Sequence, residues 1–430
     1  MSVRGNSPTA RVLHALERVD GGAHSDKLIL GELTRQSGWN RAERGSFVSR
    51  FRGVLELRRD LDRRLGPHLR RPPRSTLLQA LRLGLHDLDA GVPPWRVLAP
   101  LLAELESVSA PERGLVNGVL RGMLRSGETP RAESAKAMGR LPAWLTPALA
   151  SEGGPEPELL EQRAAALLAQ PDLWLRVRRE MIEPDTAMAR LEEAGLEPRR
   201  DPWGGDFITL GRLPEDGLAG LEGLNQGWLV VQDASTLGAV ELLDARPGMR
   251  VLDACAAPGN KSLALLDRWP GIELTANEVD EGRARSMARR LGKRIRVQQI
   301  DLREIPALPA WPRILLDLPC SGSGSVARRP EILLRDSSPI ESGLAVLQEE
   351  LLEAASRLLE PDGVLVYSTC SLLDEENGQR IRNFLARHPE FRVDGARVPD
   401  EVRDTDGAWA WLPWRQSGAG GAWAIALRKT

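Results

Sequence analysis

The first part of the chain carries apolar residues at the spacing of amphipathic helices. Leu77, Leu81 and Leu85 recur every fourth residue, and a second apolar run recurs at helical spacing over residues 115–124. This period puts the apolar side chains on one face of a helix, which buries them against its neighbours. Prolines separate the helical stretches, because proline does not fit a helix interior. The pattern therefore predicts an all-α N-terminal domain over residues 1–126.

Residues 127–225 show a weaker and mixed pattern. Residues 126–139 are polar and lack an apolar period, which indicates a linker. Residues 173–177 alternate like a strand, and residues 185–194 have a helical pattern that ends at Gly195. Glycine tolerates the left-handed conformation in which many helices end. We therefore expect a linker followed by a small α+β subdomain.

From residue 226 to residue 430 the period changes again. Apolar runs of strand length alternate with helical segments, and this alternation is typical of a doubly wound, parallel α/β sheet of the Rossmann-like kind. Helices are predicted over residues 281–291 and 344–359. The predicted strands are residues 250–254, 272–279, 295–300, 313–318 and 363–369, with residues 422–428 as a final edge strand.

The net charge of −2 conceals an uneven distribution. Residues 1–150 contain 24 Lys and Arg against 15 Asp and Glu, a net charge of +9, and the rest of the chain carries −11. The basic residues are mostly arginines, densest between positions 41 and 74. A basic half of this kind is typical of a nucleic-acid-binding front end, although solvated helix faces also produce charge runs.

The composition narrows the class of protein. A content of 42% hydrophobic and 27% charged residues is typical of a globular protein. Three cysteines are too few for a disulfide framework and favour a reducing cytoplasm. The sequence has no CxxC or HxxxH spacing, so we expect no metal. It also has no signal peptide and no apolar run of about 18 residues, so we expect a cytoplasmic protein without a membrane span. We also expect a monomer.

The first predicted strand of the α/β domain leads into a turn of small residues. Such a turn lets the backbone approach a ligand at the carboxyl end of the sheet. A Walker A loop needs GxxxxGK[ST] and a dinucleotide fingerprint needs GxGxxG, and this turn, with a single glycine, matches neither. A phosphate is therefore not the predicted ligand. The turn consists of Cys255, Ala256, Ala257, Pro258, Gly259, Asn260 and Lys261.

Acidic residues follow the next two strands. Glu278 lies 19 residues beyond Gly259, where a carboxylate can accept hydrogen bonds from two ribose hydroxyls. Asp301 ends the third strand, where a carboxylate can meet an exocyclic amine. Helix capping would explain either residue alone. Together with the turn, they favour a ligand with ribose and adenine but no pyrophosphate, and S-adenosylmethionine meets that description.

Two cysteines follow neighbouring strands. Cys320 and Cys370 lie 50 residues apart in sequence, and both are expected at the same edge of the sheet. A lone cysteine is usually buried filler, whereas two at a ligand-binding edge favour reactive thiols.

A thiol suits the methylation of cytosine, because C5 of that base is a poor nucleophile. A thiolate that adds to C6 makes C5 reactive toward a methylsulfonium, and an acid that donates at N3 assists the addition. Asp317, at the end of the fourth strand, is the candidate acid. The second thiol can help when the C5 proton and the first thiol are released.

Several stretches of the sequence resemble a known family. VLDACAAPGNKS, NEVD, DLPCSGSGSVARRPEI and LLEPDGVLVYSTCSLLDEEN are similar to the bacterial ribosomal RNA cytosine-C5 methyltransferases of the small-subunit methyltransferase B, or Fmu/Sun, type. GLVNGVLRGML resembles the NusB-like helical RNA-binding domain of that family, and LPAWL and LWLRVRRE resemble its linking region. The resemblance covers nearly the whole chain.

The resemblance implies a fold, a cofactor and a substrate. It implies a class I methyltransferase domain, S-adenosylmethionine, and RNA, in particular small-subunit ribosomal RNA. By motif, Cys370 is the nucleophile and Cys320 assists product release. Residues 255–261, Glu278, Asp301 and Asp317 would line the S-adenosylmethionine site, with Asp317 at the join between cofactor and base.

The sequence departs from the family pattern at three places. Asn260 replaces a glycine, although asparagine also adopts the left-handed conformation. A histidine is missing from residues 327–330, and Arg178–Arg179 replace an Asn-Thr pair. Two alternatives therefore stay open: the same chemistry on transfer RNA or another RNA, and a retired methyltransferase that acts as an RNA-binding assembly factor. The retention of both catalytic cysteines argues against retirement.

Overall fold

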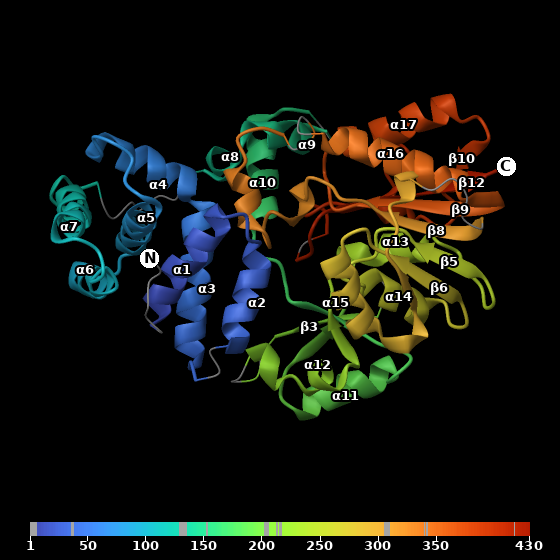
Figure 1. Cartoon of the computed structure of the whole chain (residues 1–430), viewed down its shortest axis with the longest axis horizontal. Helices are drawn as coiled ribbons and strands as arrows, with labels where there is room; N and C mark the ends of the chain where they lie inside the picture. Colours follow the sequence, from blue (N-terminus) through green and yellow to red (C-terminus); the bar gives the residue numbers. More distant parts are fainter. Residues whose placement is uncertain are drawn as a thin grey trace. The chain divides into compact units, whose positions relative to one another are not determined.

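A computed structural model of the chain describes residues 7–35, 38–128, 136–151, 154–201, 206–211, 214, 217–304, 310–338, 340, 343–416 and 418–430. The chain divides into two compact units (Figure 1). The helical unit joins Met1–Ala143 to two short segments, Glu215–Gly217 and Arg328–Asp336. The catalytic unit contains the rest of the chain.

The helical unit confirms the predicted all-α domain. Its helices bury one continuous apolar core that includes Phe47 and Phe51 of α3 and Leu81 of α5. Side chains cap several of these helices; Asn40, for example, accepts a hydrogen bond from the backbone of Glu43 at 3.0 Å. The helices are α1 (Pro8–Asp20), α2 (Ser25–Arg35), α3 (Arg41–Glu56), α4 (Arg58–Leu65), α5 (Ser75–Asp89), α6 (Pro94–Ala103), α7 (Ala110–Arg125) and α8 (Ala137–Arg140).

A short segment from late in the chain completes the helical unit. Residues 328–336, here called the docking segment, include the 3₁₀ helix η8 (Pro330–Leu334), which packs against α3. Ile332 and Leu333 of η8 are fully buried, and Leu334 packs against the helical core. The helical unit therefore takes part of its packing from residues that follow Cys320 in the sequence.

The smaller sheet lies in the catalytic unit and is antiparallel. Its strand order is β2-β3-β1-β4, with β1 (Trp174–Val177), β2 (Pro198–Arg200), β3 (Phe207–Leu210) and β4 (Leu229–Val231). Its helices are α10 (Pro157–Leu168), α11 (Pro184–Glu193) and α12 (Glu222–Gln226), after the short α9 (Thr146–Ala150). The predicted strand and helix are confirmed, and Gly195 has the expected positive φ of 70°. Of the predicted linker, residues 129–135 lie outside the described residues.

The larger sheet has the order β10-β12-β9-β8-β5-β6-β7, with β11 paired to β12. The strands from β9 to β7 are parallel, and helices connect them as expected of a Rossmann-like domain. The strands are β5 (Arg250–Asp253), β6 (Glu273–Asn277), β7 (Arg296–Gln298), β8 (Trp311–Asp317), β9 (Leu359–Thr369), β10 (Phe391–Val393), β11 (Trp409–Trp411) and β12 (Ala422–Lys429). The helices are α13 (Leu237–Glu241), α14 (Asn260–Arg268), α15 (Glu281–Leu291), α16 (Leu344–Arg357) and α17 (Gly378–Arg387).

Two expectations about this sheet were wrong. The sheet is mixed, because β12 runs antiparallel to β9 and to β10. The last strand is also not at the edge, since β12 lies between β9 and β10. Residues Trp423–Leu427 are buried in succession on both faces, which suits an internal strand rather than an exposed edge.

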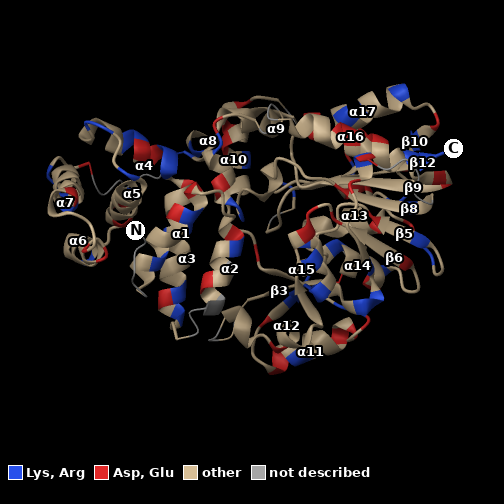
Figure 2. Ribbon diagram, in the orientation of Figure 1, with Lys and Arg blue, Asp and Glu red and all other residues tan. Residues whose placement is uncertain are grey.

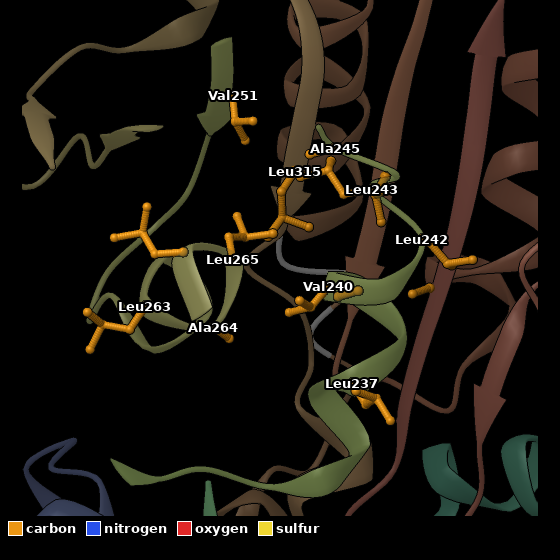
Figure 3. Close-up of a cluster of buried hydrophobic side chains, with 14 of the residues drawn as sticks. Leu237, Val240, Leu242, Leu243, Ala245, Val251, Leu263, Ala264, Leu265 and Leu315 are labelled. Atoms are coloured by element: carbon orange, nitrogen blue, oxygen red, sulfur yellow. The ribbon is translucent and has the colours of Figure 1, made fainter. Parts of the chain in front are cut away.

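The core of the catalytic unit lies where α13 and α14 pack near the large sheet. Leu237 and Val240 of α13, Leu263 and Leu265 of α14, and Leu315 of β8 belong to one buried cluster (Figure 3). This packing fixes α14, whose first turn borders the edge where β5 ends. The position of the candidate site thus depends on the packing of apolar side chains among α13, α14 and β8.

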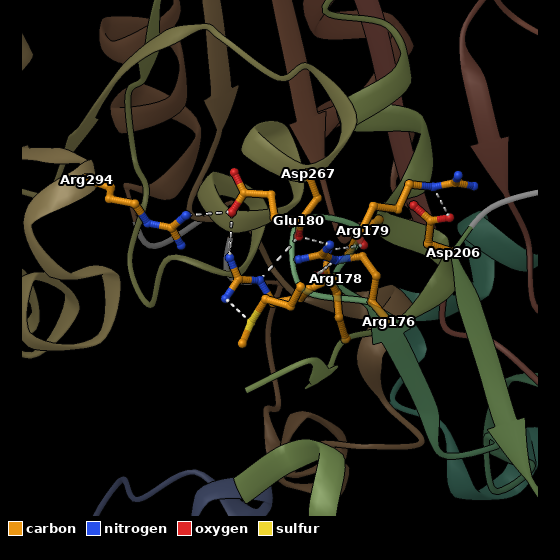
Figure 4. Close-up of polar contacts among 10 residues, drawn as sticks. Arg176, Arg178, Arg179, Glu180, Asp206, Asp267 and Arg294 are labelled. Carbon is orange, nitrogen blue, oxygen red and sulfur yellow. Dashed lines mark hydrogen bonds and ion pairs between the residues drawn. The ribbon is translucent and has the colours of Figure 1, made fainter. Parts of the chain in front are cut away.

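An ion-pair cluster joins the small sheet to α14 (Figure 4). Arg176 of β1 is buried, pairs with Asp267 of α14, and donates to Gln232 at 2.9 Å. The two arginines that depart from the family pattern have carboxylate partners here. Arg178 donates to Glu180 at 3.1 Å, and Arg179 donates to Asp206 at 2.6 Å.

Candidate active site

The carboxyl ends of the parallel strands bring the predicted site residues to one edge of the large sheet. β5 ends at Asp253, β6 at Asn277, β8 at Asp317 and β9 at Thr369. Ligands of open α/β sheets bind at this edge. The residues that end or follow these strands and β7 are Cys255, Ala256, Ala257, Pro258, Gly259, Asn260, Lys261, Glu278, Asp301, Asp317, Cys320 and Cys370.

The two cysteines that follow β8 and β9 are in contact. The two strands pair Asp317 with Ser368, which brings the turns after them together. The Sγ atoms of Cys320 and Cys370 are 3.2 Å apart, and the Cys370 backbone N–H donates to the Cys320 sulfur at 3.3 Å. Both thiols are free and half-buried. The predicted thiol pair therefore exists as a contact between sulfur atoms.

The contact makes the two thiols unequal. The Cys320 thiol donates to Cys370 and so lowers the pKa of Cys370 below its ordinary value, against the opposing effect of burial. Lys261 also lowers the pKa of Cys370, and Asp317 raises it. The same hydrogen bond, together with burial, raises the pKa of Cys320. Cys370 is thus the thiol that ionises first, and Cys320 keeps its proton.

Lys261 and Asp317, which both act on the pKa of Cys370, form an ion pair. Lys261 Nζ, in the first turn of α14, donates to Asp317 Oδ2 at 2.7 Å at the end of β8. Burial opposes the charge of Lys261, but Asp317 outweighs it, so the pKa of Lys261 is raised and the ammonium is retained.

A buried glutamate holds the turn that carries Cys320. Glu376 is 0% exposed and accepts hydrogen bonds from Ser321 N at 2.8 Å, Ser321 Oγ at 2.5 Å and Gln348 Nε2 at 2.9 Å. Its backbone carbonyl accepts from the Tyr367 hydroxyl at 2.5 Å. Because Glu376 lies six residues after Cys370, it ties the two cysteine-bearing turns to each other.

The turn after Cys320 also needs a glycine. Gly324 N donates to the Cys370 carbonyl at 3.0 Å, and Gly421 N donates to the Gly324 carbonyl at 2.8 Å. A Cβ on Gly324 would lie 2.2 Å from the Gly421 carbonyl oxygen, a distance that backbone atoms do not allow. The close approach of β12 to this turn therefore requires glycine at position 324.

The predicted cofactor turn places its one glycine where the backbone demands it. Gly259 has a φ of 96° and directly precedes α14. Asn260 is the first residue of that helix, so position 260 does not require the left-handed conformation. Its amide nitrogen donates to the Val231 carbonyl at 3.2 Å, and its Oδ1 is buried without a hydrogen-bond partner among the described residues. Burial raises the pKa of Cys255, so that thiol stays protonated.

Glu278 lies at the end of β6 and is buried. One carboxylate oxygen accepts from Asp280 N at 3.0 Å, and the other pairs with Arg283 at 3.2 Å. Arg283 also donates to the Ala257 carbonyl at 3.0 Å, so it connects Glu278 to the cofactor turn. Arg283 thus holds Glu278 and the cofactor turn together.

Asp301, beyond β7, is held by a neighbour. Arg303 donates to both of its carboxylate oxygens, including a contact of 2.6 Å, and this lowers the pKa of Asp301. Asn277 links the strand ends through its side-chain amide, which donates to the Ala254 and Ile300 carbonyls at 3.0 Å each. The three strand ends are therefore fixed relative to one another.

Sequence reasoning missed three polar residues of this edge. They are Glu376, Asn277 and Asp253, which is fully buried and accepts from Ser262 Oγ at 2.6 Å. Burial raises the pKa of Asp253 to about 7. All three lie inside stretches on which the family resemblance rests, yet none carries a local signal that distinguishes it from an exposed polar residue.

Two further classes of feature are absent from the described part of the chain. No helix there is long and apolar enough to cross a bilayer. Among the same residues, no group of three or more His, Cys, Asp or Glu is placed to hold a metal ion.

Comparison with known proteins assigns the chain to a family. Residues 240–420 match the family described as 16S rRNA methyltransferase RsmB/F, and residues 141–213 match the ferredoxin-like domain of RsmF/B-like methyltransferases. The chain is 36% identical over 362 residues to ribosomal RNA small subunit methyltransferase B of Klebsiella pneumoniae, covering 81% of this chain and 82% of that protein. The chain belongs to the RsmB/F family. The Salmonella paratyphi B protein of the same name is 34% identical over 393 residues, covering 88% and 89% of the two chains.

Solved structures share the fold of this RsmB/F member. The crystal structure of PH0851 superposes with a TM-score of 0.82 at 22% identity, covering 99% of both chains. A methyltransferase homologue from Pyrococcus horikoshii gives a TM-score of 0.55 at 26% identity, covering 72% of this chain and 98% of its own. The predicted family, fold class and enzyme class, an S-adenosylmethionine-dependent RNA methyltransferase, are confirmed.

Proposed function

We propose that this protein methylates C5 of a cytosine in small-subunit ribosomal RNA through a covalent bond between Cys370 and C6 of the base. The observation that carries the proposal is the pair of unequal thiols, with 3.2 Å between the sulfur of Cys370 and that of Cys320. The names of the relatives favour small-subunit ribosomal RNA as the substrate. We also propose that the protein acts in the cytoplasm, as a monomer.

The residues of the sheet edge fit S-adenosylmethionine. Glu278, which is buried after β6, would accept from the ribose hydroxyls, and Asp301, beyond β7, would meet the amine of the adenine. The partnerless Oδ1 of Asn260 is a buried acceptor beside the turn of residues 255–261, and it suits an amino group. When bound, S-adenosylmethionine supplies the methyl group that C5 takes up.

The chain's own residues would carry the covalent steps. The Cys370 thiolate adds to C6, and the electron pair of the C5–C6 double bond moves toward N3, which takes a proton. Asp317 accepts from the Lys261 ammonium at 2.7 Å, so the proton that N3 takes would come from Lys261 through Asp317 and return by the same path when the product is released.

Release of the methylated base breaks the bond between Cys370 and C6. After methyl transfer, the proton on C5 is removed, the C5–C6 double bond re-forms, and Cys370 leaves as a thiolate. Once Cys370 is bonded to the base, Cys320 no longer donates to a thiolate, so it can lose its own proton to solvent and then accept the C5 proton as a thiolate. The two cysteines would therefore act at different steps of one reaction.

Substitution of each cysteine tests the proposal. Cys370→Ala should lose methyl transfer and form no covalent RNA complex. Cys320→Ala should attack and methylate but release slowly, which leaves protein joined to RNA on a denaturing gel until nuclease is added. The double variant is the control and should form no complex. An adduct that accumulates in Cys370→Ala would reverse the roles, and two active single variants without any adduct would exclude the covalent mechanism.

The target RNA needs a separate measurement. Bisulfite sequencing of ribosomal RNA from a strain that lacks this protein should show one cytosine that has lost its methyl group. If the missing 5-methylcytosine lies in transfer RNA or another RNA instead, the substrate assignment is wrong while the chemistry stands.

A further inference from the structure

The docking segment is held in the helical unit by more than its apolar side chains. Glu331 accepts from the Ser25 hydroxyl at 2.5 Å, and Arg329 contacts His24 Nδ1 at 2.8 Å. Ser25 is fully buried. Residues 328–336 are therefore attached to the helices at their beginning as well as along η8.

One arginine of α4 clamps the far end of the docking segment. Arg59 Nε donates to the Leu333 carbonyl at 3.0 Å, and Arg59 Nη2 donates to the Arg335 carbonyl and to Asp336 Oδ1, also at 3.0 Å each. Two of the three acceptors are backbone carbonyls, so the guanidinium fixes the path of the main chain.

The docking segment follows the catalytic turn directly in the sequence. Arg328 lies eight residues after Cys320 and three after Ser325. In the same turn, Gly324 N donates to the Cys370 carbonyl at 3.0 Å, and the nearby Ser325 hydroxyl lowers the pKa of Cys370. Only a few residues of backbone therefore separate the docking segment from the turn that contacts Cys370.

We propose that Arg59 is a positioning residue for the methyl-transfer site. By holding the backbone of the docking segment, it keeps the short chain that carries Gly324 and Ser325 in the conformation in which Gly324 N donates to the Cys370 carbonyl. The helical unit would then serve catalysis directly as well as RNA binding. This inference rests on the proposed function, since it requires Cys370 to be the nucleophile.

A guanidinium is needed for this role because it donates from several nitrogens in a fixed plane. An ammonium at the same place is a point charge on a flexible stem and cannot reach the three acceptors with the same geometry. Arg59→Lys should therefore keep the positive charge of α4 but lose most of the positioning. Arg63, one turn further along α4, is 65% exposed and pairs with Asp60, so Arg63→Ala is the matched control.

The test follows adduct formation in the full-length Cys320→Ala protein, which should attack and methylate the base but release it slowly. Saturating S-adenosylmethionine and a saturating fragment of small-subunit ribosomal RNA remove differences in binding. Arg59→Ala should slow adduct formation about 10-fold, since small misplacements of a reacting group have effects of this size or larger. Arg59→Lys should be slowed nearly as much, and it replaces Arg59→Ala in the test if that variant does not fold. Arg63→Ala should form the adduct at the rate of the Cys320→Ala protein.

The outcomes separate positioning from RNA contact. If Arg59→Ala needs more RNA for half-saturation but reaches the parent rate, Arg59 is an RNA ligand and the positioning role is wrong. A slower rate of adduct formation at saturating RNA in both Arg59 variants, with unchanged RNA affinity, supports the positioning role. A parent protein that forms no adduct overturns the proposed function itself, and this inference with it.

Discussion

Helix α4 and the carboxyl edge of the large sheet hold charged residues in different ways. On α4, Arg58 and Arg63 pair with carboxylates, and two aspartates lie between two pairs of arginines (Figure 2). At the sheet edge, Glu376, Glu278 and Asp253 are buried, and each is held by hydrogen bonds from the protein. Surface pairs contribute little to stability, whereas a buried carboxylate is costly without its donors. The edge is therefore where single substitutions should matter most.

The largest expected effect on stability is at Glu376. Glu376→Ala leaves Ser321 and Gln348 donors unpaired inside the protein, so the free energy of unfolding should fall by about 3 kcal/mol. Urea denaturation followed by circular dichroism measures the loss. Glu375→Ala is the matched control, because Glu375 is exposed in the same turn and should leave the unfolding midpoint unchanged. Equal midpoints for the two variants would contradict the role assigned to the buried network.

The next effect concerns cofactor binding by Glu278. If Glu278 holds the ribose, Glu278→Ala should weaken S-adenosylmethionine binding by about 1–3 kcal/mol, because buried hydroxyls lose their acceptor. Isothermal titration calorimetry measures the affinity. Glu281→Ala, at an exposed position that begins α15, should bind like the unchanged protein. Wild-type affinity in Glu278→Ala would remove Glu278 from the cofactor site.

The pH dependence of adduct formation should depend on Cys320. The reaction needs the Cys370 thiolate, so its rate rises with pH as Cys370 loses its proton. Cys320 donates to that sulfur and lowers the pKa of Cys370, so Cys320→Ala should move the rise to higher pH. A pH profile of single-turnover adduct formation, compared with methyl transfer in the unchanged protein, checks the direction. A profile that stays in place or moves to lower pH would show that the hydrogen bond does not set the ionisation.

The smallest effects are expected at the basic surface of the helical unit. Arg70 and Arg71 are exposed, so their replacement by alanine should weaken RNA binding only because fewer phosphates are neutralised. The slope of log affinity against log salt should fall by about one for each phosphate that no longer has an arginine partner. Fluorescence anisotropy with a ribosomal RNA fragment over a salt series measures this slope. An unchanged slope in the double variant would place the RNA elsewhere.

Local patterns predicted most of the secondary structure, and non-local pairing explains the errors. The helix over residues 281–291 has the predicted ends, because its apolar period and the capping residue Asp280 are local. The position of β12 depends on a partner, β10, that is only three residues long and has no strong signal of its own. Glu376 could not be distinguished from its neighbours in an acidic run, since its burial arises from contacts with Ser321 and Gln348 far away in the sequence.

The candidate site was predictable where motif and topology agree. Strand ends gave the places of Cys320 and Cys370, but the 3.2 Å between their sulfurs depends on the register of β8 and β9, which sequence patterns do not contain. The attachment of residues 328–336 to the helices was not predictable, because nothing in that stretch marks it as part of an α-helical core.

The docking segment also has a consequence for the order in which the chain folds. Arg59 and Leu333 are separated by 274 residues, so a ribosome needs on the order of tens of seconds between them. In the later part of that interval, the helices have left the ribosome exit tunnel, but the face of α3 that η8 covers has no partner. The first unit to be synthesised is thus among the last to be completed. A gene divided at residue 143 would yield a helical half without Ile332 and Leu333, two buried residues of the same compact unit.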